Sequence, residues 1–330
     1  MIFGYGKYVY RVIEGWGKQF YTPFVEVAGL GVDSKDQVYI FIRGIDAILV
    51  YDSKGNLLKS WGRGYFSSRP HGLCVGPDDS IYCTDDGDHT VRKFTRDGRL
   101  LMILGQRNQP SGTGCVNRDY RTIKQSAGPF NCPTDVALDK EGNIYVSDGY
   151  GNARIHKFSK EGEFLLSWGE PGRDPGQFNL PHGIFISQEG TVYVADRENS
   201  RIQLFDSEGK FIDQWNANRP TDLFIYKENL FVTELGYKVG SRLRSTGPKD
   251  GILAGRLSIF TLEGKLLSHW WSNDGCAPGG FFAPHALCVD SKGSLYVGEV
   301  TITAGGPANC HTLQKFVRIA ETHQDHKHSA

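Results

Sequence analysis

The sequence has 330 residues, 39% of them hydrophobic, which is enough chain for one large domain or two smaller ones. Lys plus Arg and Asp plus Glu both total 37, so the chain lacks the basic excess of a nucleic-acid-binding protein. No apolar run approaches the roughly 18 residues of a membrane-spanning helix, and the first residues lack the pattern of a secretory signal. We therefore expect neither a nucleic-acid partner nor a membrane partner.

The first predicted element is a strand over residues 8–17, which ends in Trp-Gly. One pattern is then repeated six times, and the repeats begin at Val27, Arg69, Cys132, Leu180, Arg219 and Ala283. Each repeat holds two apolar runs separated by a turn of Asp, Lys and Gly, and the second run ends near an Asp or Glu. This pattern predicts two antiparallel strands joined by a tight turn. A further strand pair follows, as in ILVYDSKGNLLKSWG after the first repeat.

Six four-stranded units of roughly 40 residues each predict an all-β fold, a six-bladed β-propeller. The sixth unit has a third strand at residues 312–320 but no fourth. We expect the strand at residues 8–17 to complete that blade and close the ring, which removes an exposed sheet edge. The predicted domain is a single propeller over residues 8–320, with a disordered polar tail over 321–330. The repeat resembles the NHL repeat, whose propellers include both enzymes and interaction scaffolds.

Two long polar segments interrupt the regular spacing, at residues 105–131 and at residues 234–256. Both are rich in Gly and carry several Arg or Lys residues. They are either tolerated surface loops or lids over the mouth of the central channel, and their length favours lids.

Histidine recurs at one position of the repeat, after the proline that opens the first strand. The six residues there are Ala28, His71, Thr134, His182, Thr221 and His285. The histidines occupy only the even blades, which lie about 120° apart around a six-bladed ring. Because the first strands line the channel, three imidazoles would converge on its axis. Three histidines with open positions suit a catalytic Zn²⁺, and Fe, Mn or Co share the same ligands.

Three further candidates follow the second strands at the same mouth of the channel. Arg43 and Arg197 occupy equivalent positions on opposed blades, and Tyr150 follows the second strand of blade three. Two guanidiniums near a metal predict a substrate carboxylate, and a tyrosine near cations loses its proton more readily and can act as a base. The alternative is that the arginines pair with acids at the blade ends, such as Asp148 and Asp196.

The stretches RPHGL, CPTDVAL, VSDGYGNARI, VADRENSRIQLF and APHALCV resemble peptidyl-α-hydroxyglycine α-amidating lyase, the second catalytic unit of the peptide-amidating enzyme. The resemblance covers about residues 27–317 and is best over 131–205. It implies that zinc is held by His71, His182 and His285. It also implies that Tyr150 is the catalytic tyrosine and that Arg43 and Arg197 are the active-site arginines.

The sequence departs from that family at a calcium site and at two disulfides. The resemblance implies an Asp after the third histidine, where this chain has Ala286, so only backbone ligands near Val27 and Leu73 would remain for calcium. Cys132 matches one disulfide cysteine, but its partner position is Gly151. The second pair falls on Tyr193 and Leu204. With seven cysteines and no CxxC pair, we expect reduced thiols and a cytoplasmic protein.

These observations favour a metal-dependent lyase that acts on an α-hydroxy amide and releases an amide and an aldehyde such as glyoxylate. Two alternatives stay open. The same metal site could serve another lyase, hydratase or hydrolase reaction on a small carboxylated substrate, or the propeller could be a non-catalytic partner-binding protein. The expected partner is a small-molecule substrate with a carboxylate, and the expected state is a monomer.

Overall fold

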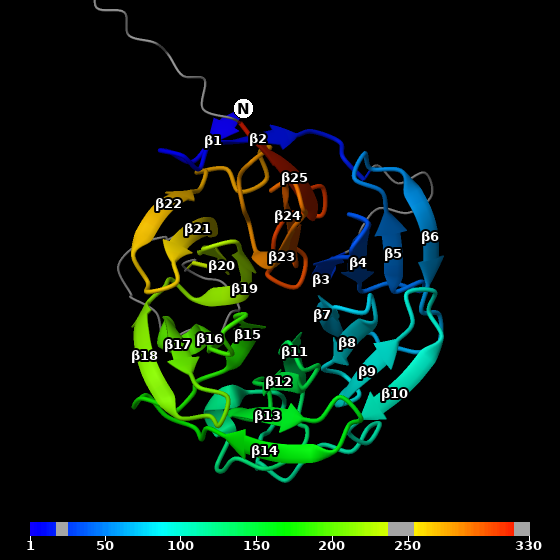
Figure 1. The fold of residues 1–330 in the computed structure, drawn as a ribbon, viewed down its shortest axis with the longest axis vertical. Helices are drawn as coiled ribbons and strands as arrows, with labels where there is room; N and C mark the ends of the chain where they lie inside the picture. The colour runs from blue at the N-terminus through cyan, green and yellow to red at the C-terminus, as the bar shows by residue number, and fades with distance from the viewer. Residues whose placement is uncertain (18–25, 237–253, 320–330) are drawn as a thin grey trace, which may run out of the picture.

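Six antiparallel sheets stand around a central axis in the computed structural model, which describes residues 1–17, 26–236 and 254–319 (Figure 1). This arrangement confirms the predicted all-β six-bladed propeller of four-stranded blades. The first strand of each blade faces the axis and the last lies at the rim (Figure 1).

The blades follow the chain in order, each running from the axis outward. Blade one is β3 (Val27–Val32), β4 (Val38–Ile42), β5 (Ile48–Tyr51) and β6 (Leu57–Trp61). Blade two is β7 (Pro70–Val75), β8 (Ile81–Asp85), β9 (Thr90–Phe94) and β10 (Leu100–Leu104). Blade three is β11 (Pro133–Leu138), β12 (Ile144–Asp148), β13 (Arg154–Phe158) and β14 (Phe164–Trp168).

Blade four is β15 (Pro181–Ile186), β16 (Val192–Asp196), β17 (Arg201–Phe205) and β18 (Phe211–Asn216). Blade five is β19 (Pro220–Tyr226), β20 (Asn229–Glu234), β21 (Arg256–Thr261) and β22 (Leu266–Trp270). Two 3₁₀ turns, η1 (Tyr120–Thr122) and η2 (Arg197–Asn199), lie in connecting segments.

The sixth blade joins the two ends of the described chain. It consists of β23 (Pro284–Val289), β24 (Leu295–Glu299), β25 (Leu313–Arg318), β2 (Tyr10–Ile13) and β1 (Ile2–Phe3). β2 pairs antiparallel with β25, with Tyr10 opposite Arg318 and Ile13 opposite Lys315. The predicted closure by the N-terminal strand is confirmed. The short outer strand β1 is an addition that the repeat pattern did not contain.

The turn residues explain why each apolar run folds back on itself. Asp52 accepts hydrogen bonds from the backbone N–H groups of Lys54 and Asn56, both at 2.9 Å. Gly55 has a φ of 94°, a left-handed conformation that costs glycine no steric strain. Asp139 and Gly142 repeat this arrangement between β11 and β12. An Asp three residues before a Gly therefore marks these hairpins.

The Trp-Gly endings of the outer strands hold neighbouring blades together. The ring of Trp61 lies so close to Gly98 in the next blade that a Cβ there would come within 2.7 Å of it. Trp168 of blade three and Gly209 of blade four make the same contact. Trp16, beyond β2, packs against Gly55 of blade one and donates from Nε1 to Ser53 O at 3.1 Å. The residues after β2 therefore pack as the end of a fourth strand.

The carboxylates that end the second strands of blades two to six cap the loops entering those blades. Asp148 accepts from the backbone N–H of Asn131, and Asp196 accepts from that of Asn179 at 2.8 Å. Glu299 does the same for Phe282 and Ala283. Because these acids are buried, the backbone bonds satisfy charge that would otherwise be costly.

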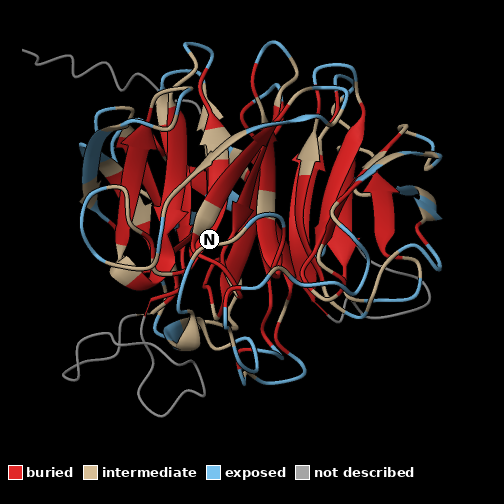
Figure 2. Cartoon of the chain, turned by 90° about the horizontal axis from the view of Figure 1, so that it is seen from below, coloured by how far each residue is buried: buried red, intermediate tan, exposed pale blue. Residues whose placement is uncertain are grey.

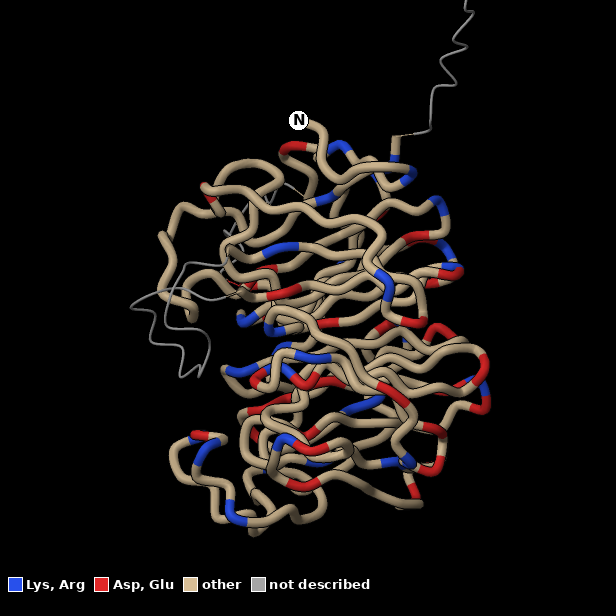
Figure 3. Tube along the Cα trace, turned by 90° about the vertical axis from the view of Figure 1, so that its left-hand side faces the viewer, with Lys and Arg blue, Asp and Glu red and all other residues tan. Residues whose placement is uncertain are grey.

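Burial is concentrated in the inner and middle strands, while the turns are exposed (Figure 2). Acidic and basic residues are interspersed along the described chain (Figure 3). No helix among the described residues is long and apolar enough to cross a membrane.

One cysteine prediction is wrong. Cys276 and Cys310 form a disulfide that links the segment before β23 to the loop after β24. The other five cysteines are free thiols, of which Cys83, Cys132 and Cys288 are buried. The partners are 34 residues apart in sequence, and only the packing of blade six brings their Cα atoms to 4.8 Å. Spacing along the chain therefore gave no sign of the pair.

Candidate metal centre at the axis

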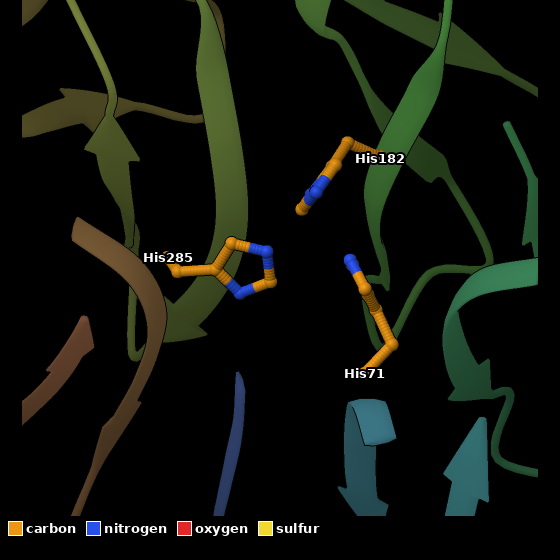
Figure 4. A group of neighbouring side chains, drawn as sticks. All are labelled: His71, His182 and His285. Carbon is orange, nitrogen blue, oxygen red and sulfur yellow. The ribbon is translucent and has the colours of Figure 1, made fainter. Parts of the chain in front are cut away.

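Three histidines meet at the axis of the propeller, one from each even blade. His71 on β7, His182 on β15 and His285 on β23 each follow the proline that opens the strand. Their ring centroids form a nearly equilateral triangle with sides of 4.6, 4.7 and 4.8 Å (Figure 4). All three are buried, and one ring nitrogen of each lies within 4.8 Å of the others. The alternate-blade spacing thus brings the predicted trio together.

The odd blades fix the orientation of these rings. His71 Nδ1 lies 2.5 Å from Thr134 O, and His182 Nδ1 lies 2.6 Å from Thr221 O. His285 Nδ1 lies 2.9 Å from Ala28 O. A carbonyl can only accept, so each Nδ1 carries the hydrogen and each Nε2 presents a lone pair. Even blades supply the rings, and odd blades supply the carbonyls that orient them.

The chemistry of the three Nε2 atoms fits a metal ion. Three lone pairs that face one another inside a protein repel unless a cation or a donor lies between them. His285 Nε2 is buried and has no hydrogen-bond partner among the described residues. A divalent ion with nitrogen ligands would satisfy that nitrogen.

The histidines are held in the neutral form that metal binding requires. Burial lowers the pKa of His285 to about 3, with the charge of Arg43 as the next cause. Burial also lowers the pKa of His71, followed by the charges of the other two histidines and of Arg43. For His182 burial is again the largest cause of a lowered pKa, and Arg197 is the next. The same electrostatics show that both arginines lie near the imidazoles.

Tyr150 lies directly beside the trio, two residues beyond the end of β12. Its hydroxyl is 3.3 Å from His71 Nε2 and 3.3 Å from His182 Nε2. It also accepts a hydrogen bond of 3.2 Å from Arg197 Nη1. Both Nε2 atoms are acceptors, so the single phenolic hydrogen can serve only one at a time. The hydroxyl is placed to exchange a proton with a group bound at the axis.

Arg197, at the start of η2, is held by a buried glutamate. Its Nε donates to Glu198 Oε1 at 2.9 Å, and Arg219 donates to the same carboxylate at 2.6 Å. Burial raises the pKa of Glu198, but the charges of Arg197 and Arg219 outweigh it and the net shift is downward. The carboxylate is therefore ionised and fixes the guanidinium of Arg197 against Tyr150.

Arg43, after β4 in the opposite blade, has a matching glutamate. Its Nη1 donates to Glu26 Oε2 at 2.6 Å and to Thr303 Oγ1 at 2.9 Å, and its Nε lies 3.4 Å from Pro70 O. Neither arginine pairs with Asp148 or Asp196, which cap loops instead. In both arginines Nη2 has no hydrogen-bond partner within residues 1–17, 26–236 and 254–319. Each side chain therefore keeps one nitrogen available to an anion.

The insertion at residues 105–131 forms hydrogen bonds with the turn that carries Tyr150. Thr113 Oγ1 donates to Gly151 O at 2.6 Å, and Asn131 Nδ2 donates to Thr113 Oγ1 at 3.0 Å. The segment thus holds the turn that carries Tyr150. The other predicted lid is residues 234–256, of which residues 237–253 lie outside the described part of the chain.

Several residues of the site escaped prediction. Glu198 is inside the ADREN stretch, and its place beside Arg197 could have marked it. Glu26 and Thr303 have no such signal, because they are 277 residues apart and meet only through ring closure.

Below the histidines the channel is lined by carboxylates from two odd blades. Asp135 and Asp222 follow Thr134 and Thr221, whereas Ala286 follows His285. Asp135 and Asp222 border a cavity of about 280 Å³ with mainly apolar walls at the far end of the channel. The acidic residues in this part of the channel therefore occupy positions other than the one where the family resemblance placed calcium.

Comparison with known proteins agrees with this architecture. The NHL repeat model matches residues 68–94, 130–158 and 178–205. Peptidyl-glycine α-amidating monooxygenase B of Xenopus laevis is 36% identical over 316 residues, which cover 84% of this chain and 33% of the relative. NHL repeat-containing protein 3 of Homo sapiens is 34% identical over 318 residues, 89% of this chain and 82% of the relative. Peptidyl-α-hydroxyglycine α-amidating lyase 1 of Drosophila melanogaster is 34% identical over 188 residues, 53% of this chain and 32% of the relative.

Among solved structures, a streptogramin B lyase aligns with a TM-score of 0.60 at 14% identity, covering 93% of this chain and 97% of that one. This likeness shows the fold alone. The chain spans about a third of the length of the amidating monooxygenase that it matches, and most of NHL repeat-containing protein 3. The chain belongs to the family of NHL-repeat β-propellers that contains the peptidyl-α-hydroxyglycine α-amidating lyases.

Proposed function

We propose that this protein is a metal-dependent lyase that cleaves the C–N bond of an α-hydroxy amide carrying a carboxylate. The products would be a primary amide and an aldehyde that carries the carboxylate, such as glyoxylate. The observation that carries the proposal is the Tyr150 hydroxyl, which lies 3.3 Å from two of the three axial histidines and accepts from Arg197. Relatives named as amidating lyases support it.

The metal would be held by the Nε2 atoms of His71, His182 and His285. Each Nδ1 carries the hydrogen that is donated to a backbone carbonyl, so each Nε2 presents a lone pair. We propose zinc, because it accepts three histidines with positions left open. A divalent ion there would supply Lewis-acid polarisation of a substrate oxygen.

Tyr150 would move the proton. In its ionised form it would take the hydrogen of the substrate hydroxyl, whose O–H electron pair becomes the second bond of the new C=O group. The C–N pair then leaves with the amide nitrogen, and Tyr150 returns the proton to that nitrogen. No oxidant or reductant is needed, because the proton is returned and every electron pair is accounted for.

Arg43 and Arg197 would orient the substrate carboxylate from opposed blades. In each arginine, Nε and Nη1 already donate hydrogen bonds to a glutamate and to neutral oxygens, so Nη2 is the nitrogen that would bind the substrate. A carboxylate with two oxygens could thus be held between two arginines.

The direct test is release of glyoxylate from an N-acyl-α-hydroxyglycine by the metal-loaded protein, with metal content measured on the same sample. We expect stoichiometric metal and glyoxylate release that exceeds the spontaneous rate. Stoichiometric metal without release would favour another reaction at the same centre. Protein that holds no metal after loading would favour a binding propeller, the alternative that the similarity to NHL repeat-containing protein 3 leaves in place.

We also propose a monomer without nucleic-acid or membrane partners. The cytoplasmic location stays a prediction, and one of its premises has fallen, since Cys276 and Cys310 are bonded and disulfides persist mainly in oxidising compartments.

A further inference from the structure

A loop of blade six reaches across the closure of the ring to Arg43 of blade one. It follows β24, and Thr303 is the residue of this loop that meets the arginine. The contact joins two parts of the chain that are 260 residues apart. Arg43 is thus held by a segment from the other end of the propeller sequence.

Thr303, Glu26 and Arg43 form a closed set of hydrogen bonds. Arg43 Nη1 donates to Glu26 Oε2 at 2.6 Å and to Thr303 Oγ1 at 2.9 Å. The Thr303 hydroxyl donates to Glu26 Oε2 at 2.7 Å, and the Thr303 backbone N–H donates to Glu26 Oε1. Both hydrogens of Nη1 are therefore used, and Glu26 cannot turn without breaking bonds to the loop.

The loop itself is fixed at both ends. Val300 N donates to Ala283 O at 3.1 Å, and Gly306 N donates back to Thr301 O at 2.8 Å. At the far end the Cys276–Cys310 disulfide ties the loop to the segment before β23. Thr303 is exposed, yet it sits on a fixed backbone.

We propose that Thr303, together with Glu26, is a positioning residue that aims Nη2 of Arg43 at the substrate carboxylate. A guanidinium is planar, so fixing Nη1 against Glu26 and Thr303 fixes the direction in which Nη2 points. The inference rests on the proposed function for the identity of the anion. The geometry that carries it, a hydroxyl that satisfies both members of an ion pair, does not depend on the reaction.

The test is Thr303→Val, which keeps the shape of the side chain and removes only the oxygen. Because Thr303 is exposed, the variant should fold and bind metal as the wild type does. We expect KM for the carboxylate substrate to rise about tenfold, the scale of one charge-assisted hydrogen bond, with kcat changed less than twofold. KM for the neutral amide analogue of that substrate should not change. Thr303→Ser should restore KM, and Ile302→Ala, an exposed neighbour in the same loop, should resemble wild type.

Calorimetric titration with glyoxylate separates this inference from the proposed reaction, because binding needs no turnover. A wild type that binds glyoxylate but releases none from the hydroxyglycine substrate would refute the reaction, while the Kd of Thr303→Val would still test the positioning role. Equal Kd and KM in Thr303→Val and wild type would overturn the inference. An equal rise of KM for the charged and neutral substrates would overturn it too, since that pattern marks a general disturbance of the mouth.

Discussion

Each axial histidine is oriented by a carbonyl of the neighbouring blade, so the tautomer of the ring is set before any ligand arrives. His285 differs from the other two because no hydrogen bond joins it to Tyr150, and its Nε2 has no hydrogen-bond partner in the part of the chain that the structure describes. A metal would satisfy this nitrogen. The Nε2 atoms of His71 and His182 could instead accept a hydrogen bond from the Tyr150 hydroxyl, one at a time.

Loss of this histidine should therefore cost metal binding. We expect His285→Ala to lower metal affinity by at least about tenfold, because even residues behind the ligands have effects of that size. The measurement is metal content by plasma emission after dialysis at a fixed free metal concentration. His269→Ala in the outer strand β22 is the matched control. Full occupancy in His285→Ala would contradict the three-histidine centre.

The Tyr150 hydroxyl has three polar neighbours, and the ring is held by packing beside His71 and His182. Tyr150→Phe keeps this packing and removes the hydroxyl that we propose carries the proton. We expect the variant to fold and to hold metal, with turnover reduced by a factor of about 10² or more. The measurement is kcat at saturating substrate together with metal content. Turnover close to wild type would show that another group is the base.

At the scale of the element, the end of each second strand decides what the blade contributes. Arg43 and Arg197 each directly follow a second strand, β4 and β16, and each donates its backbone N–H to the residue that precedes the first strand of its blade, Glu26 O and Leu180 O, both at 3.2 Å. This is why the two arginines lie in equivalent places although 154 positions separate their numbers in the chain. The short helical turn η2 then presents Glu198 to its neighbour Arg197.

Ring closure depends on the ladder between β2 and β25. Val9 and Ile319 form a hydrogen-bonded pair of this ladder, so the alternation of an antiparallel pair makes Arg11, opposite Val317, the next residue whose N–H points to β25. Arg11→Pro should weaken the ladder by about 1–3 kcal/mol, because proline supplies no N–H and leaves a carbonyl of β25 without its donor. Arg11 is exposed, so Arg11→Ala removes the side chain at little cost and isolates the loss of the ladder bond. The free energy of unfolding in urea would measure both. A proline variant no less stable than the alanine variant would show that the ladder contributes little to closure.

At the scale of the whole molecule, the channel is divided into a histidine end and a carboxylate end. Burial raises the pKa of Asp222 to about 7. It also raises the pKa of Asp135, with the charge of Asp222 as the second cause. The folded protein therefore binds protons here that the unfolded chain has already lost.

This difference predicts that the Asp222 carboxyl group stabilises the fold less and less as the pH rises from about 4, near the unfolded pKa of an aspartate, to about 7. The folded pKa lies above the unfolded one, so the stabilisation is complete at low pH and disappears as the pH rises through about 7. The slope should reach up to about 1.4 kcal/mol per pH unit for each proton released. In this window the axial histidines act in the opposite sense, because their lowered pKa values keep them neutral in the folded state while the unfolded chain gains their protons below about pH 6.5. The contribution of Asp222 is therefore measured as the difference between the wild type and a variant at this position.

The measurement is urea unfolding of the metal-free protein across that range. Asp222→Asn should gain stability relative to the wild type as the pH rises, while Asp213→Asn in the exposed outer strand β18 should differ from the wild type by an amount that does not depend on pH. A pH-independent difference for Asp222→Asn would show that Asp222 does not bind the extra proton of the folded state.

The sequence by itself determined the six blades, the closure by the first strand and the meeting of the three histidines. These features follow from local rules that repeat: an Asp, Ser or Thr and a residue in the left-handed conformation, most often Gly, make most hairpins, a Trp-Gly ending packs on the next blade, and alternate blades face the axis at equal angles. Because position in the repeat fixes position in the ring, residues 71, 182 and 285 could be placed together without coordinates.

The tertiary structure alone decided the contacts that the repeat does not specify. The glutamates that hold Arg43 and Arg197, the reach of Thr303 to Glu26 and the Cys276–Cys310 disulfide join loops that differ from blade to blade. Loops outside the repeat carry no periodic signal, and the angle at which they leave a blade depends on the packing of neighbouring loops. The physical reason is that backbone pairing determines the ring, whereas side-chain contacts between irregular loops determine how the arginines at its mouth are held.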